Sequence, residues 1–233
     1  LYIEHVNALA EPLSARGVTP MIWADMALHH HQALEMLSRQ IVLCDWMYDI
    51  YRGNGKVFVW GQGLRRKDEL DEPTRARFGA SLFPHGDEPA REPETFYTAD
   101  FLAAQGFRVL TCPAASSYGD TVFTPRNWHH LVNTRDSFQQ GRAPHLLGSL
   151  LTSWSVRLHP WELQRAHIEL AGALGRGRPV EDDLDAWGAR WAQRTFGLAD
   201  GAALWRACGL LSKTCLFTDS GTLGFGKDCQ PAP

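Results

Sequence analysis

The sequence has 233 residues, with 23 Lys and Arg against 26 Asp and Glu, which gives a formal net charge of -3 at pH 7. This balance argues against a nucleic-acid partner, because affinity for phosphates depends on clustered positive charge. Hydrophobic residues make up 44% and charged residues 21% of the chain, which is typical of a folded domain with a sizeable core. No apolar run approaches the roughly 20 residues that a membrane span requires, so we expect a soluble protein without a membrane partner.

The five cysteines are odd in number, scattered and without a C-x-x-C pair. This arrangement indicates neither a zinc site nor a disulfide framework, and we expect no cofactor. It favours a cytoplasmic over a secreted protein. The first residues, from Leu1 to Leu13, already have the apolar spacing of a helix, so we expect a fragment that begins inside or just before a helix.

The predicted elements then alternate between helices and buried strands. The first helix is expected to end near Gly17, and a strand follows it over Thr19–Asp25. A helical stretch from His29 to Arg39 leads to a second, continuously apolar strand over Ile41–Asp45.

The middle of the chain departs from this alternation. From about residue 53 to 95 it is polar and rich in turn residues, which predicts an insertion with a short strand over Val57–Trp60. Its three Asp-Glu dipeptides are interpreted as solvated charge, and Gly61-Gln62-Gly63 is interpreted as a turn, because it lacks the context of a dinucleotide-binding loop.

After the insertion the alternation resumes. A helix over Phe96–Gln105 leads to a strand over Arg108–Cys112, and a helix over Asn127–Gln140 leads to a strand over Leu147–Trp154. Four nearly continuous apolar strands separated by helices are typical of a parallel sheet covered on both faces. We therefore expect an α/β fold, with only helices after about Trp161.

Aromatic and acidic residues follow three of the four predicted strands. Because parallel strands bind ligands at their carboxyl ends, we expect these side chains to line one pocket. Indole rings stack on the C–H faces of sugars and carboxylates accept hydrogen bonds from sugar hydroxyls, so the pattern favours a sugar site, although a tryptophan at a strand end can equally be a core residue. The residues are Trp23, Asp25, Asp45, Trp46, Tyr48 and Trp154.

Several ordered motifs carry a resemblance to a known family. They are Thr19–Met26 (TPMIWADM), Val42–Tyr48 (VLCDWMY), Arg108–Ser117 (RVLTCPAASS), Trp128–Asn133 (WHHLVN) and Gly148–Trp154 (GSLLTSW). Together they resemble the fifth to eighth strands, and the helix before the eighth, of glycoside hydrolase family 20 β-N-acetylhexosaminidases of the hexosaminidase D type. The resemblance covers roughly residues 1–170. It implies the C-terminal half of a (β/α)8 TIM barrel over residues 1–175 and a helical extension and tail over residues 176–233.

The resemblance also implies a reaction. Family members remove terminal N-acetylhexosamines with retention, and the acetamido oxygen of the substrate acts as the nucleophile. An adjacent Asp-Glu pair at the end of their fourth strand supplies the acid, and this chain has no such pair before Thr19. We therefore expect the missing N-terminal half of the same barrel to be the partner that carries the acid, and this chain alone to be inactive.

The resemblance assigns roles to individual residues as well. It makes Tyr48 the candidate catalytic donor to the acetamido oxygen, with Tyr118 as a rival. Many family members have a Glu where this chain has Val156, so recognition of the distal sugar hydroxyls is not implied. The implied contacts to the N-acetylhexosaminide substrate come from the remaining strand-end residues: Trp23, Asp25, Asp45, Trp46 and Trp154.

Two alternatives stay open. A degenerate barrel could bind sugars through the same aromatic residues without an acid, and a metal-dependent hydrolase on another parallel α/β fold would use Asp25, Asp45 and a histidine. Three consecutive residues on a helix point in three directions, so His29-His30-His31 is interpreted as a solvated helix start rather than a metal site. The same interpretation applies to His129-His130.

Overall fold

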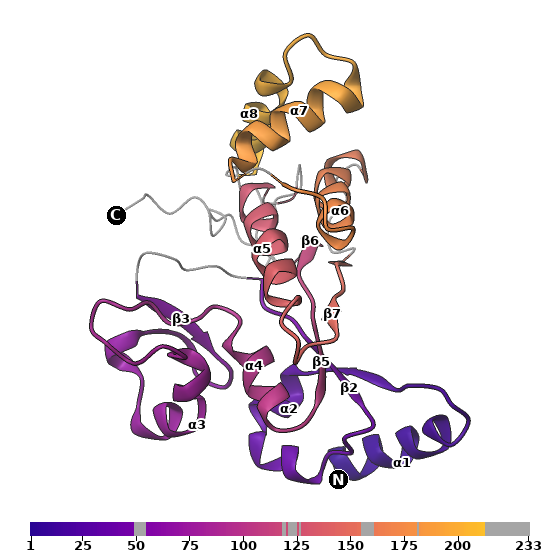
Figure 1. Ribbon diagram of the computed structural model, residues 1–233, viewed down its shortest axis with the longest axis vertical. Helices are drawn as coiled ribbons and strands as arrows, with labels where there is room; N and C mark the ends of the chain where they lie inside the picture. The colour runs from indigo at the N-terminus through magenta and orange to yellow at the C-terminus, as the bar shows by residue number, and fades with distance from the viewer. Residues whose placement is uncertain are drawn as a thin grey trace, which may run out of the picture. The chain divides into compact units, whose positions relative to one another are not determined.

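The computed structural model describes residues 1–48, 55–117, 120, 125, 127–154, 161–180 and 182–212 (Figure 1). The chain divides into two compact units. The first comprises Leu1–Cys112 and Gln139–Leu150, and the second comprises Pro113–Phe138 and Leu151–Pro233. Within the described ranges, no helix is long and apolar enough to cross a membrane.

A four-stranded parallel sheet organises the first unit. Its strands lie side by side in the order of the sequence, which confirms the predicted parallel arrangement and the α/β class. They are β1 (Met21–Trp23), β2 (Val42–Asp45), β5 (Arg108–Thr111) and β7 (Gly148–Ser149).

The last predicted strand, Leu147–Trp154, is divided in the structure. Its first part, β7, pairs with β5, and its second part, β8 (Thr152–Ser153), pairs in parallel with β6 (Ala114–Ser116) in the second unit. Pro113 separates β5 from β6 and offers no N–H to a ladder, and the register shifts between Ala114 and Ser116. A continuous apolar run in the sequence therefore yields two short strands.

The two faces of the parallel sheet have different surroundings. Ile22, Leu43 and Val109 occupy matching register positions and pack in the hydrophobic core. Residues of α1 (Tyr2–Ser14) and α4 (Tyr97–Ala104) contribute to that core. Because successive strand residues point to opposite sides, Trp23 and Cys44, which are also register partners, lie on the other face.

The helix predicted from His29 to Arg39 is instead two short elements. These are α2 (Asp25–His29) and the 3-10 helix η1 (His31–Met36). The guanidinium of Arg39 donates from Nη1 to the carbonyl oxygens of Leu34 (2.7 Å) and Leu37 (2.6 Å), which satisfies carbonyls where η1 ends. The first helix does stop before Gly17, whose φ of 75° suits a left-handed C-terminal position, as predicted.

Residues 55–95 form a packed part of the first unit. They contain the antiparallel hairpin β3 (Lys56–Val59) and β4 (Gly63–Arg66), the 3-10 helix η2 (Lys67–Glu69) and α3 (Glu72–Leu82). Gly61 and Gly63 have φ angles of 85° and 78°, so the predicted turn is confirmed. Although the segment is polar overall, several of its side chains belong to the same hydrophobic core as the sheet: Val57, Val59, Trp60, Leu70, Phe78, Leu82 and Phe83.

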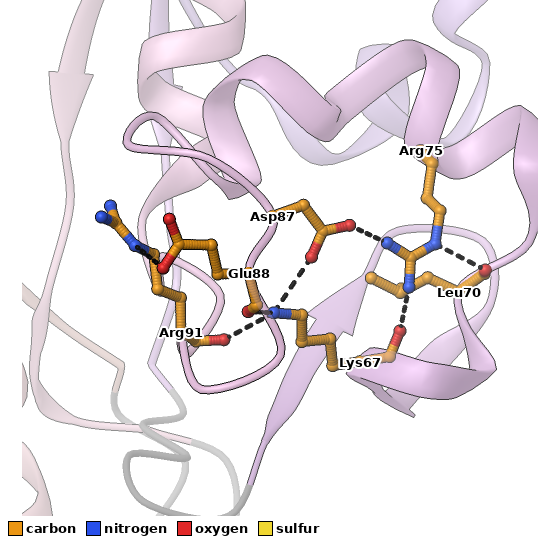
Figure 2. Close-up of polar contacts among 6 residues, drawn as sticks. All are labelled: Lys67, Leu70, Arg75, Asp87, Glu88 and Arg91. Carbon is orange, nitrogen blue, oxygen red and sulfur yellow. Dashed lines mark hydrogen bonds and ion pairs between the residues drawn. The ribbon is translucent and has the colours of Figure 1, made fainter.

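Figure 2 shows the polar contacts that hold this segment together. The Lys67 side chain is 16% exposed, and its Nζ pairs with Asp87 (3.0 Å) and donates to the carbonyl oxygens of Arg91 (2.8 Å) and Glu88. Arg75 also pairs with Asp87 and donates to the carbonyl oxygen of Lys67. Two cations therefore bind the carboxylate of Asp87, which is still 38% exposed, so this predicted solvated charge also links parts of the segment.

The second unit is mainly helical in its described part. Besides β6 and β8 it contains most of α5 (Asn127–Gln140), together with α6 (Trp161–Gly175), α7 (Leu184–Phe196) and α8 (Gly201–Leu211) (Figure 1). The predicted helix over residues 127–140 is confirmed. A Cβ atom on Gly188 of α7 would lie 2.2 Å from the Trp205 ring of α8, so only glycine permits this approach of the two helices.

Candidate functional site

Five aromatic rings gather where β2 ends, and we call them the aromatic cluster. Trp46 and Tyr48 are half-buried and stack, with ring centroids 5.0 Å apart and planes inclined by 27°. Trp60 meets Trp46 edge-on at 4.7 Å. Phe58 and His29 contact Trp60 in turn, at centroid distances of 5.1 Å and 5.3 Å. Offset and edge-on pairs at these distances are the favourable arrangements of aromatic rings.

The local structure explains why these rings meet. Trp46 and Tyr48 directly follow β2, whereas His29 ends α2, the helix that follows β1. The β3–β4 hairpin places Trp60 at its turn, where the ring contacts both Trp46 and His29. The aromatic cluster therefore lies at the carboxyl end of β2, and the carboxyl ends of parallel strands are where α/β folds bind their ligands.

The indole N–H of Trp60 is a buried hydrogen-bond donor. Its side chain is 8% exposed, and its indole Nε1 is buried without an acceptor among the described residues. Buried indole N–H groups ordinarily find an acceptor, and an unmet donor needs an explanation. Because this nitrogen is itself buried, Trp60 contributes to the aromatic cluster through its ring rather than through its N–H.

The Asp45 carboxyl group points toward α4, away from the face that carries Trp23 and Cys44. Asp45 is 3% exposed, and its Oδ2 accepts a hydrogen bond of 2.7 Å from the Thr98 hydroxyl. Its Oδ1 is buried and has no partner in the described part of the chain. Burial raises the pKa of Asp45 to about 7, the Thr98 hydrogen bond opposes this rise, and the charge of Asp100 adds to it. Asp45 therefore exchanges a proton near neutral pH, but both of its carboxyl oxygens are turned into the unit, so the predicted contact with a sugar hydroxyl finds no support in this geometry.

The other predicted site residues are distributed as follows. Trp23 ends β1 and is 38% exposed, and Asp25 is the half-buried first residue of α2. Trp154 belongs to the second unit, where its backbone N–H donates to Ser116 (3.0 Å). Tyr118 lies outside the described residues. The structure thus brings Trp46 and Tyr48 together, whereas the convergence of Trp154 with them stays a prediction.

A second polar cluster lies inside the second unit. The side chains of His130 and Asp120 are fully buried, and His130 Nε2 lies 2.8 Å from Asp120 Oδ1. The backbone N–H of Ser117 donates to the other carboxyl oxygen of Asp120 (2.9 Å), and the His167 ring meets His130 edge-on at 5.8 Å. His129 is also buried, at 8% exposure, so the expectation that His129 and His130 begin a solvated helix turn is wrong.

The geometry of the described residues gives little support for a metal-binding site. Across the ranges that the structure describes, no three His, Cys, Asp or Glu side chains are grouped so that they could hold an ion. Asp45, one of the residues that a metal-dependent hydrolase would use, has one carboxyl oxygen engaged by Thr98.

Comparison with protein-family models, curated proteins and solved structures finds no match to this chain, so its function is inferred from its residues and their geometry alone. Sequence reasoning missed four residues of the site: Trp60, Phe58, His29 and Thr98. The continuous apolar run from Val57 to Trp60, followed by a glycine turn, was a usable signal for Trp60. Thr98 is 53 positions from Asp45, and no local pattern links the two.

Proposed function

We propose that the chain is the C-terminal half of a (β/α)8 barrel whose complete form removes terminal N-acetylhexosamines. The observation that carries this proposal is the stacked Trp46–Tyr48 pair at the carboxyl end of a sheet whose four strands follow the order of the sequence. Sequential strand order favours a barrel, since a doubly wound sheet reverses its order at a switch point. The stacked rings favour a sugar, because they present flat apolar surface beside polar hydroxyl and indole groups.

In this proposal the aromatic cluster holds the acetamido group of the substrate. The Tyr48 hydroxyl donates a hydrogen bond to the acetamido oxygen and orients it toward the anomeric carbon. The indole of Trp46 packs against the acetamido methyl group. As the acetamido oxygen forms its bond to the anomeric carbon, the glycosidic bond breaks, and donors already in place stabilise the developing charge.

The leaving oxygen needs a proton from a separate acid. The aromatic cluster contains no carboxyl group, and Asp45, despite its raised pKa, is buried against Thr98 of α4. The proposal therefore places the acid in an Asp-Glu pair of the barrel's first half. Trp23 and Asp25 complete the sugar contacts of this unit once both halves of the barrel are together.

Hydrolysis of an aryl N-acetyl-β-glucosaminide tests the proposal. Protein expressed from the complete gene should turn this substrate over, whereas residues 1–233 alone should not. Tyr48→Phe should lower kcat by about 100-fold, because it removes one preorganised donor and keeps the ring. Tyr2→Phe, at a position that is 45% exposed, is the matched control and should leave kcat unchanged.

Each contrary result has a distinct meaning. Turnover by residues 1–233 alone would require an acid within this chain and would contradict the division of the site between two halves. Binding of N-acetylglucosamine by the complete protein without hydrolysis would favour the degenerate sugar-binding barrel. Hydrolysis that a chelator abolishes would favour the metal-dependent alternative.

A further inference from the structure

Three helices of the second unit border a cavity of about 520 Å³, a volume within the range of small-ligand sites. α5 contributes Trp128, α7 contributes Asp185, and α8 contributes Arg206, Gly209 and Leu210. None of these residues has a role in the proposed hydrolase site. The chemistry at the edge of the cavity therefore needs its own explanation.

The apolar part of the cavity is open to solvent. Trp128 is 57% exposed and Leu210 is 67% exposed. Within the described ranges, the Trp128 indole forms no contact with another aromatic ring and no hydrogen bond. A free, flat indole face at the edge of a cavity is suited to stacking against a ligand ring.

The charged part of the cavity contains one group of each sign. Arg206 is exposed, and no described residue forms a hydrogen bond or an ion pair with its guanidinium. Asp185 Oδ1 accepts a hydrogen bond of 3.0 Å from Trp205 Nε1, which holds this carboxylate in place, and its Oδ2 has no described partner. A ligand that fits both groups has an anionic group for the guanidinium and a hydrogen-bond donor for the carboxylate.

We propose that this cavity binds a carboxylated sugar of the hexuronic acid type. The sugar ring stacks on Trp128, its carboxylate pairs with Arg206 through two parallel hydrogen bonds, and a ring hydroxyl donates to Asp185 Oδ2. A neutral sugar would leave the guanidinium unpaired, and an aromatic acid would bring no hydroxyl to Asp185. A phosphate dianion would be repelled more strongly by Asp185 than a carboxylate is. The site does not depend on the hydrolase proposal.

Titration with sodium glucuronate tests this site directly in residues 1–233. The chemical shift of the Trp128 indole N–H should move saturably with a millimolar dissociation constant. Glucose and sodium benzoate serve as neutral and aromatic probes, and each should bind about tenfold more weakly or worse. Arg206→Gln should weaken glucuronate binding by about tenfold or more, while Arg194→Gln, an α7 arginine outside the cavity lining, should leave it unchanged.

A second variant that fills the cavity separates a loss of binding from a loss of folding. A Cβ atom on Gly209 would meet no atom within 4 Å, so Gly209→Gln can project a side chain into the cavity without disturbing α8. We expect it to abolish glucuronate binding with an unchanged far-UV circular dichroism spectrum. Absence of a saturable shift with glucuronate, equal affinity for glucose, or full binding by both Arg206→Gln and Gly209→Gln would overturn the proposal.

Discussion

Replacing Asp45 by Asn should stabilise the first unit above neutral pH and leave its stability almost unchanged in acid. Burial raises the pKa of Asp45 from 3.8 to about 7 in the folded state. Between these two pH values the folded chain holds a proton that the unfolded chain has released, so stability falls as the pH rises from about 4 to about 7 and remains lower above it. The substitution removes the ionisation and therefore this loss.

The magnitude follows from the pKa difference. A rise from 3.8 to about 7 is a difference of about 3, and at 1.36 kcal/mol for each pKa unit this costs about 4 kcal/mol of folding free energy above pH 7. The amide of Asn keeps an oxygen that can accept the Thr98 hydrogen bond, but its second group is an unsatisfied NH₂. In acid the protonated carboxyl group has an equally unpaired O–H, so these two costs offset each other, and we expect Asp45→Asn to gain about 4 kcal/mol at pH 8 and about 0 kcal/mol at pH 4.

Urea unfolding at pH 4 and at pH 8 measures this difference. Thr98→Val is the complementary variant, because it removes the hydrogen bond that lowers the Asp45 pKa and keeps the shape of the side chain. It should reduce stability more at pH 8 than at pH 4, opposite to Asp45→Asn. If Asp45→Asn changed stability equally at both pH values, or reduced it at pH 8, the ionised carboxylate would be stabilised in the fold and the reasoning would be refuted.

Three further substitutions test the aromatic cluster and the packing around it. Trp60→Leu should reduce the free energy of unfolding by about 3 kcal/mol and weaken N-acetylglucosamine binding, because Trp46 loses its edge-on neighbour. Unchanged binding in a titration would show that Trp60 is not part of the site. Lys67→Met should reduce the free energy of unfolding by about 2 kcal/mol and speed cleavage of residues 83–94 in limited proteolysis, because three oxygen atoms lose the cation that binds them. A wild-type cleavage rate would contradict a stabilising role of Lys67. Gly188→Ala should reduce the free energy of unfolding by about 1–3 kcal/mol, because the added methyl group overlaps the Trp205 ring. An unchanged Tm would show that α7 and α8 can move apart without loss of stability.

The parallel sheet could be predicted because its signal is local. Each strand is a short apolar run between helical segments, and residues such as Leu43 and Val109 are buried on adjacent strands. The helix over residues 127–140 was also recovered with its bounds. Such patterns depend on the runs and the spacing of apolar residues within one segment, and no distant contact is needed to interpret them.

The packing of residues 55–95 against the sheet could not be predicted from the sequence in the same way. Their polar composition predicted a separate insertion, yet Val57 and Phe78 share the core with the sheet, and Lys67 and Asp87 pair across the segment. Composition averages over a segment, whereas packing depends on a few well-placed apolar side chains and on charges that neutralise one another. The hairpin turn was predicted, but the position of Trp60 beside Trp46 was not.

The sequence by itself determined the α/β class and the parallel strands, and it identified the aromatic pair, Trp46 and Tyr48, that follows one of them. Only the tertiary structure decided that Asp45 turns toward Thr98 of α4, that the ring of Trp60 packs against Trp46, and that His130 is buried in contact with Asp120. Periodicity along the chain shows which positions are buried within one element, because each helix or strand has a regular repeat. It carries no information about which distant side chain fills the space opposite, and that neighbour sets the hydrogen bonds, the desolvation and therefore the pKa of each group.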